Sequence, residues 1–185
     1  ILLSTFLKRF DVAMSYFDEL TSAMGLLAGH PQTLFVGQSV YYGGQRAHAT
    51  FRDVPMERRI EMPIAEDFTV GFCTGLALAG YVPVLFLPRW DFLLMAANQL
   101  VTHLDKIPLM SEFRPKVIIR TAVGGRKPLD PGHQHIGDYS IAFRWMFKTV
   151  RVVDLKDAGQ VVPAYRVALE AECSTILVEY MEFYG

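Results

Sequence analysis

Apolar residues recur along the chain at helical and strand spacings in alternation. An apolar stripe at helical spacing runs from position 12 to 27, and Gly29 and Pro31 end it. Four further stretches, one of them opened by Glu66 and one capped by Asp91, also predict helices. The expected helices cover residues 12–27, 68–79, 91–103, 140–147 and 158–169. Short apolar runs bounded by turn residues predict strands at residues 33–37, 83–87, 117–119, 150–153 and 175–179.

Two segments lack either spacing and predict loops. Residues 41–59 are polar and contain glycine, and residues 121–137 are rich in glycine and proline. Strands that alternate with helices, and that are apolar on both faces, predict an α/β fold. We expect a single three-layer domain over residues 1–185, with a mostly parallel sheet covered by helices on both faces and with residues 1–29 as a helical lead-in. Ligands of such sheets bind beyond the carboxyl ends of the strands, so the 121–137 loop is expected to form a wall of the site.

The composition narrows the class of protein. The chain has 185 residues, of which 51% are hydrophobic and 20% are charged, and its net charge is −1. A chain of this size forms a large core without disulfide bonds, and the apolar excess is typical of a large partner interface. The absence of basic runs argues against a nucleic-acid partner, and no run reaches the ~18 apolar residues of a membrane span.

Two further features bear on the cellular location. The first residues of the chain are apolar, but the stretch is too short for a secretory signal, and charged residues follow it too soon. Cys73 and Cys173 lie in apolar surroundings and form no disulfide framework, which favours buried thiols in a reducing environment. We therefore expect a cytoplasmic protein.

A series of short motifs resembles one enzyme family. The segment Ile60-Glu-Met-Pro-Ile-Ala-Glu66 is followed by Ala79-Gly80, and Tyr42-Gly43-Gly44 precedes it. The long loop contains Pro131-Gly132-His133-Gln134, similar to the family's Gly-Pro-x-His element. In this order and at these spacings, the motifs resemble the transketolase-like, pyrimidine-binding domain of thiamine-diphosphate enzymes. The resemblance covers residues 30–185 and is closest to the beta subunit of pyruvate and branched-chain 2-oxo-acid dehydrogenases.

The resemblance implies functional roles for residues at the cofactor. Glu66 would hydrogen-bond the aminopyrimidine ring of thiamine diphosphate and favour the tautomer that removes the thiazolium proton. Ile64 would line this ring and Phe92 would stack on it, which adds roughly 0.5 to 1.5 kcal/mol beyond area burial. His133 matches the family's histidine that assists protonation of substrate and intermediate, and the nearby His135 leaves the register open. The apolar residues around Glu66 favour its protonated form, which suits a proton relay.

Ordinary structural explanations exist for the same residues. Glu66 also fits a first-turn carboxylate that faces the helix dipole. Phe92 and Ile64 fit core packing, and His133 fits an exposed loop histidine. The histidines and cysteines have no zinc-ligand spacing, so we expect no metal site on this chain.

Parts of the family pattern are absent from the sequence. Gln38-Ser39 stands where the family has an acidic pair, and Pro88-Arg89-Trp90 replaces the family's run before Phe92. The family holds Mg²⁺ and the diphosphate through a Gly-Asp-Gly element and a following asparagine, whereas this chain has no such element and a single asparagine, Asn98. We therefore expect the thiamine diphosphate to be shared with a diphosphate-binding, alpha-type partner subunit that carries the Mg²⁺, and we expect self-association.

These observations predict a subunit or fragment of a thiamine-diphosphate-dependent enzyme that is inactive without its partner. It would supply the pyrimidine-binding side and Glu66 for decarboxylation or dehydrogenation of a 2-oxo acid. One alternative is a split transketolase-like subunit that transfers aldehyde units between sugar phosphates. A second alternative is a non-catalytic structural or binding subunit that retains the fold.

Overall fold

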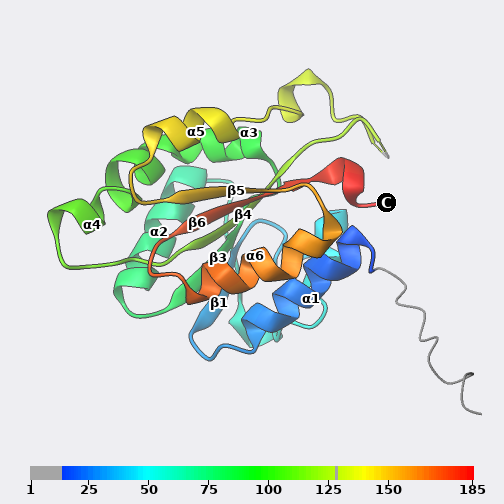
Figure 1. The fold of residues 1–185 in the computed structure, drawn as a ribbon. Helices are drawn as coiled ribbons and strands as arrows, with labels where there is room; N and C mark the ends of the chain where they lie inside the picture. Colours follow the sequence, from blue (N-terminus) through cyan, green and yellow to red (C-terminus); the bar gives the residue numbers. More distant parts are fainter. Residues whose placement is uncertain (1–13, 128) are drawn as a thin grey trace, which may run out of the picture.

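The computed structural model describes residues 14–127 and 129–185, and six strands in this part of the chain form one sheet (Figure 1). Neighbouring strands follow the order β2-β1-β3-β4-β6-β5, and every neighbouring pair is parallel. The strands are β1 (Thr33–Gly37), β2 (Arg59–Glu61), β3 (Val82–Phe86), β4 (Ile118–Val123), β5 (Arg151–Leu155) and β6 (Thr175–Tyr180). The predicted α/β fold with a parallel sheet is confirmed.

Helices cover both faces of the sheet, which gives three layers (Figure 1). The α-helices are α1 (Tyr16–Ala28), α2 (Glu66–Leu78), α3 (Trp90–Leu93), α4 (Ile107–Met110), α5 (Ser140–Met146) and α6 (Ala158–Glu170). The 3-10 turns are η1 (Arg46–Phe51), η2 (Met56–Arg58), η3 (Leu94–Ala96), η5 (His133–His135) and η6 (Met181–Phe183), and η4 (Gln99–Leu104) is a π-helix. Helices α1 and α6 pack on one face, and α2, α3 and α5 pack on the other. No helix in the described part of the chain is long and apolar enough to span a membrane.

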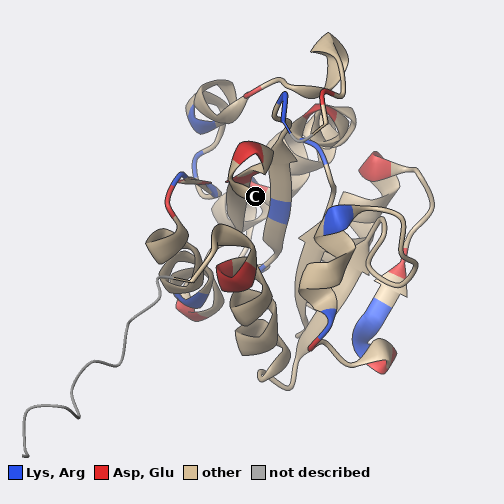
Figure 2. Cartoon of the chain, turned by 90° about the vertical axis from the view of Figure 1, so that its right-hand side faces the viewer, with Lys and Arg blue, Asp and Glu red and all other residues tan. Residues whose placement is uncertain are grey.

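The strands divide their side chains between two hydrophobic cores because successive residues of a strand point to opposite faces. Phe35 and Phe86 belong to the core under α1 and α6, whereas Val36 and Leu85 belong to the core under α2 and α5. All of these side chains are fully buried. The strands carry few charged residues (Figure 2), and a sheet that is apolar on both faces needs both helical layers, which sets the three-layer fold.

One ion pair is fully buried in the core under α1 and α6. Arg120 on β4 and Glu179 on β6 have no exposed side-chain surface, and two hydrogen bonds join them. The Tyr165 and Tyr184 hydroxyls also donate to the Glu179 carboxylate. Burial alone would lower the pKa of Arg120, but the charge of Glu179 and the neighbouring tyrosines raise it. The buried carboxylate is thus surrounded by hydrogen-bond donors, which offset the cost of burying an ion pair.

The predicted loop over residues 41–59 is wrong in part. It contains the two short turns η1 and η2, and its last residue, Arg59, begins strand β2. The Arg59 guanidinium donates to the backbone carbonyls of Val40, Phe51 and Val54. The Arg59 side chain therefore holds backbone groups of this segment in place. Such hydrogen bonds do not require apolar residues at regular spacing, so the sequence pattern does not reveal them.

The predicted helix over residues 91–103 is also corrected. The chain there is divided among α3, η3 and η4, which are α-helical, 3-10 and π-helical in turn. Asp91 does not cap a helix, because α3 begins one residue earlier and the Asp91 carboxylate accepts a hydrogen bond from the Tyr139 hydroxyl. The apolar spacing is compatible with all three helical forms, and tertiary contacts choose among them.

Smaller differences concern the ends of elements. Strand β4 continues to Val123, so the long loop begins at Gly124 rather than at residue 121. Helix α1 begins at Tyr16, where the Ser15 hydroxyl accepts from the Asp18 backbone N–H. The first residues of the predicted 12–27 helix, and residues 1–13 of the predicted lead-in over residues 1–29, lie outside the described residues.

Candidate functional site

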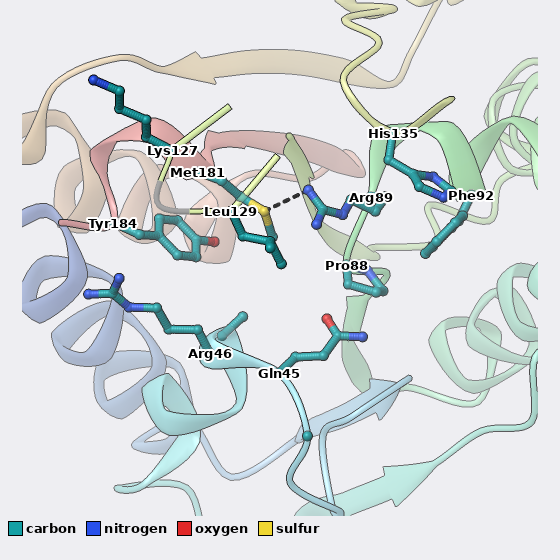
Figure 3. A pocket seen from close by; sticks show the side chains of 12 residues that line it. Gln45, Arg46, Pro88, Arg89, Phe92, Lys127, Leu129, His135, Met181 and Tyr184 are labelled. Atoms are coloured by element: carbon teal, nitrogen blue, oxygen red, sulfur yellow. Dashed lines mark hydrogen bonds between the residues drawn. The ribbon is translucent and has the colours of Figure 1, made fainter. Parts of the chain in front are cut away.

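A cavity of about 400 Å³ lies at the carboxyl edge of the sheet (Figure 3). Its walls come from the segments that directly follow β1, β3, β4 and β6. The lining residues are Gly44, Gln45, Arg46, Ala47, Pro88, Arg89, Phe92, Lys127, Leu129, His135, Met181 and Tyr184. The wall predicted from the glycine-rich loop is present, since Lys127, Leu129 and His135 belong to that loop.

Glu66 lies at the same edge of the sheet, at the first residue of α2. The Gln38 side-chain Nε2 donates a hydrogen bond of 2.9 Å to Glu66 Oε1. Gln38 directly follows β1, and its backbone N–H donates to the Phe86 carbonyl of the neighbouring strand. Gly37 makes this approach possible: its φ is +144°, and a Cβ there would lie 2.0 Å from the Phe86 carbonyl oxygen. The strand end therefore aims Gln38 at Glu66.

A second carboxylate holds the loop after β1. The Glu61 carboxylate accepts backbone N–H hydrogen bonds from Ser39, Val40, Tyr41 and Tyr42 at 2.6 to 3.4 Å. Successive N–H groups that converge on one anion form a concave nest, and here a side chain of the same chain fills it. These hydrogen bonds hold residues 39–42, which directly follow Gln38, and so fix the end of β1 beside α2.

Phe92 and His135 meet inside the cavity. Their rings pack edge to face with centroids 5.4 Å apart. The Nδ1 atom of His135 is buried and has no hydrogen-bond partner within the described residues. His133 is exposed and does not line the cavity, although both histidines belong to η5. Of the two histidines that the sequence left open, the structure places His135 at the cavity.

Arg89 brings positive charge into the cavity (Figure 3). One of its guanidinium nitrogens lies 2.9 Å from the Met181 sulfur. Burial lowers the pKa of Arg89, and the nearby charge of Asp91 partly opposes this shift. A Cβ on Gly124 would lie 2.6 Å from the guanidinium and 2.0 Å from the His135 carbonyl oxygen, so a glycine there leaves room for both groups.

Sequence reasoning missed the roles of Gln38 and Arg89. Gln38 directly follows β1, and Arg89 lies shortly after the end of β3, where ligands of parallel sheets collect. Each also stands where the sequence departs from the family pattern, and that departure was the signal that could have identified them.

Curated proteins of similar sequence include two enzyme subunits. The chain is 29% identical over 118 residues to the 2-oxoisovalerate dehydrogenase subunit beta of Bacillus subtilis (strain 168), a match that covers 60% of this chain and 36% of that protein. It is 30% identical over 129 residues to the pyruvate dehydrogenase E1 component subunit beta of Cyanidium caldarium, which covers 65% of this chain and 38% of that protein. The chain resembles the beta subunits of 2-oxo-acid dehydrogenases.

The resemblance to dehydrogenase beta subunits is partial in length. The chain spans less than two-fifths of each of these two relatives. A solved structure of a split-gene transketolase, described as an inactive beta4 tetramer, shares the fold with a TM-score of 0.68 and 19% identity over 89% of this chain and 51% of that chain. No protein-family model matches the sequence. The comparisons therefore show a transketolase-like fold and a beta-subunit type of sequence.

In this beta-subunit-like chain, the predicted site residues fall into two groups. Phe92 lines the cavity, whereas Glu66 and Ile64 lie outside it, near the start of α2. Ile64 is 86% exposed, and the neighbouring Phe68 is 59% exposed. The apolar surroundings expected for Glu66 are therefore open to solvent in this chain alone. Within the described residues, no cluster of three His, Cys, Asp or Glu side chains could hold a metal ion.

The residues near Glu66 fit the aminopyrimidine part of thiamine diphosphate. One carboxylate oxygen of Glu66 is bonded to Gln38, and the other accepts no hydrogen bond from the described residues. The free oxygen can accept an N–H from a bound ring, and the exposed Ile64 side chain offers an apolar surface beside it. The sequence lacks the Gly-Asp-Gly element with which the family binds the diphosphate, so the family's diphosphate site is not present on this chain.

Proposed function

We propose that the chain is the pyrimidine-binding component of a thiamine-diphosphate-dependent enzyme that acts on a 2-oxo acid. The observation that carries the proposal is the placement of Glu66, which begins α2 at the carboxyl edge of the sheet with one oxygen fixed by Gln38 and the other free. The similarity to dehydrogenase beta subunits supports the reaction class. When bound, thiamine diphosphate supplies a carbon nucleophile for cleavage beside the carbonyl group.

The residues of this chain would bind and orient the cofactor and transfer a proton. Glu66 would hold a proton at the ring nitrogen of the aminopyrimidine, and Ile64 would line one side of that ring. Gln38 keeps the Glu66 carboxylate in one orientation through its 2.9 Å hydrogen bond. His135, at the cavity, is placed to exchange protons with the substrate, and the Phe92 ring restricts the orientation of its imidazole.

The exposed side of α2 supports a partner chain. Glu66 and Asp67 are its only charged residues, and both stand in its first turn. Beyond them Phe68 and Leu78 are exposed, and a Cβ on Gly75 would meet nothing within 4 Å. A helix that is apolar all round is normally buried, so this side fits a covering partner that would also enclose Glu66.

We infer that the partner is a diphosphate-binding, alpha-type subunit that holds the diphosphate and Mg²⁺. The absence of the Gly-Asp-Gly element from this sequence supports that division. The relatives are named as subunits, and the structural neighbour is described as a tetramer, which supports an assembly that also contains further copies of this chain.

A non-catalytic role is the second candidate, and Gln38-Ser39 in place of the acidic pair is the observation that favours it. The hydrogen bond from Gln38 to Glu66 weighs against that role, because Gln38 contacts the carboxylate to which we assign the proton relay.

The test is a Glu66→Gln variant of the chain assembled with its diphosphate-binding partner. Glutamine keeps the size of the side chain and cannot relay a proton, so exchange of the thiazolium proton should fall by at least ~10²-fold while cofactor affinity stays within about tenfold. Glu57→Gln, at an exposed residue of η2, is the matched control and should behave like the parent. Exchange at the parent rate in Glu66→Gln would show that Glu66 is only a helix-start carboxylate.

A further inference from the structure

The cavity at the carboxyl edge contains a cation that the role proposed for Glu66 does not use. Arg89 follows Pro88 in the segment after β3 that lines the cavity, and Figure 3 shows its guanidinium extending into the cavity toward Met181. The charged ends of Arg46 and Lys127 point away from the centre in the same view. Arg89 is therefore the charge that a ligand in this cavity would meet.

Arg89 has little compensation within this chain. Among the described residues, no carboxylate oxygen lies within 4.0 Å of its guanidinium, and its one side-chain hydrogen bond goes to the thioether of Met181. A thioether is a weak acceptor, whereas a guanidinium has five N–H donors. Half-burial without an anion is costly for a cation, and the lowered pKa of Arg89 reflects that cost. The remaining donors are available to a ligand.

His135 lines the same cavity as Arg89. His135 Nδ1 is buried and makes no hydrogen bond with the described residues. The Arg89 guanidinium and the His135 backbone both pack against Gly124, so the two residues are neighbours across one glycine. No Asp or Glu lines the cavity. The charge of Asp91 acts on Arg89 from outside the cavity, but a guanidinium and an imidazole in a cavity that no carboxylate lines form a site for an oxyanion.

The chemistry of decarboxylation limits which oxyanion this site can serve. When a 2-oxo acid loses CO₂, the bond from the acyl carbon to the carboxylate breaks, CO₂ leaves uncharged, and the electron pair stays on the acyl carbon. A cation bound to the reacting carboxylate would stabilise the ground state more than the transition state and would slow this step. Arg89 is better suited to a group whose charge persists through the reaction.

We propose that Arg89 and His135 bind a second, non-reacting oxyanion of the substrate. The substrate class is then a carbonyl compound with a remote carboxylate or phosphate group, and the apolar pyruvate-like and branched-chain acids are disfavoured. This inference rests on the proposed function for the identity of the reaction, but the oxyanion site itself is built by this chain alone.

The experiment measures binding of simple oxyanions to the full chain by calorimetry at constant ionic strength, with chloride as the reference salt. Inorganic phosphate and acetate are the two probes, and the tighter of them identifies the group as a phosphate or a carboxylate. Arg89→Gln should weaken binding of that probe at least tenfold. Arg166→Gln, at an exposed arginine of α6, is the matched control and should bind like the parent.

Two results would overturn the proposal. One is that the parent chain binds neither probe more tightly than chloride, and the other is that Arg89→Gln binds as the parent does. If Arg89→Gln does not fold, as judged by circular dichroism, Arg89→Lys decides the matter. Lysine keeps the charge but lacks the planar fork, so binding should weaken severalfold, and parent-like binding would contradict the proposal.

The oxyanion site and the proposed function fail separately. Glu66→Gln should leave phosphate or acetate binding unchanged, because Glu66 lies outside the cavity. Loss of oxyanion binding in Arg89→Gln together with parent-like proton exchange in Glu66→Gln would keep the site and reject the cofactor role. Parent-like oxyanion binding in Arg89→Gln together with slowed proton exchange in Glu66→Gln would keep the cofactor role and reject the oxyanion site.

Discussion

Gln38 donates a 2.9 Å hydrogen bond to Glu66, and this contact joins the end of strand β1 to the first residue of helix α2. The two residues are far apart in the sequence and meet because β1 and β2 are parallel neighbours whose carboxyl ends lie at one edge. The bond leaves one Glu66 oxygen free and restricts how the carboxylate can turn. Gln38 therefore helps to orient the carboxylate that we propose as the proton relay.

Gln38→Leu should slow thiazolium proton exchange in the assembled enzyme by about 10-fold or more, because a freely rotating carboxylate spends less time in the productive orientation. Cofactor affinity should change less than the exchange rate. Isotope exchange followed by NMR measures the rate, and Gln160→Leu, at an exposed residue of α6, is the control. Parent-like exchange in Gln38→Leu would show that Glu66 is oriented by other contacts, such as those of the partner.

His135→Ala should reduce turnover of the assembled enzyme by ~10²-fold or more, since loss of a positioned acid–base group has an effect of that size. His133→Ala should have a smaller effect, because His133 is exposed outside the cavity. Steady-state kinetics of the two variants makes the comparison, and each serves as the control for the other. A larger loss in His133→Ala would assign the role to His133 and would require the loop to rearrange in the assembly.

Asp105 should make the stability of the fold depend on acid pH. Its buried carboxylate accepts backbone N–H bonds from Lys148, Thr149 and Val150. Burial alone would raise the pKa of Asp105, but the hydrogen bonds from Lys106 and these backbone groups lower it from 3.8 to about 2. A lowered folded-state pKa stabilises the fold above pH 3.8, and this stabilisation is lost as the pH falls through about 2.

Urea unfolding of the parent and Asp105→Asn at a series of pH values checks this expectation. The stability gap between them should narrow by about 2 kcal/mol from neutral pH to below pH 2, following the size of the pKa shift. Asp53→Asn, at an exposed residue, should show no such narrowing. A gap that is constant with pH would show that Asp105 does not carry this linkage.

Arg120→Met should destabilise the fold by about 3 to 5 kcal/mol, because it leaves the buried Glu179 carboxylate without its cation. Adding Glu179→Leu should recover part of this loss. Arg144→Met, which breaks the more exposed pair with Asp154, should cost about 1 kcal/mol or less. Urea unfolding of the parent and these three variants measures the differences, and equal losses for the two arginines would contradict the buried-pair account.

The pattern of apolar residues alone determined the layered α/β fold of this protein. Strands such as 33–37 and 175–179, and helices such as 158–169, were predicted within one or two residues of the observed elements. Both faces of such strands are apolar, so the sheet requires helices on both sides wherever the chain folds. The motif around Glu66 likewise placed this residue at the start of a helix, because the signals for a helix start are local.

The tertiary structure decided which residues share a site. Which strand ends are adjacent in the sheet decides that Gln38 contacts Glu66 and which residues surround Arg89. It also decides that His135, and not His133, lines the cavity. Strand order is set by long-range packing and leaves no trace in local spacing. Segment 41–59 shows the same limit, because the Arg59 side chain bonds backbone carbonyls of this segment and Phe51 packs in the core, and neither contact follows from local spacing. Local periodicity thus specifies elements, and only their assembly specifies the chemistry between them.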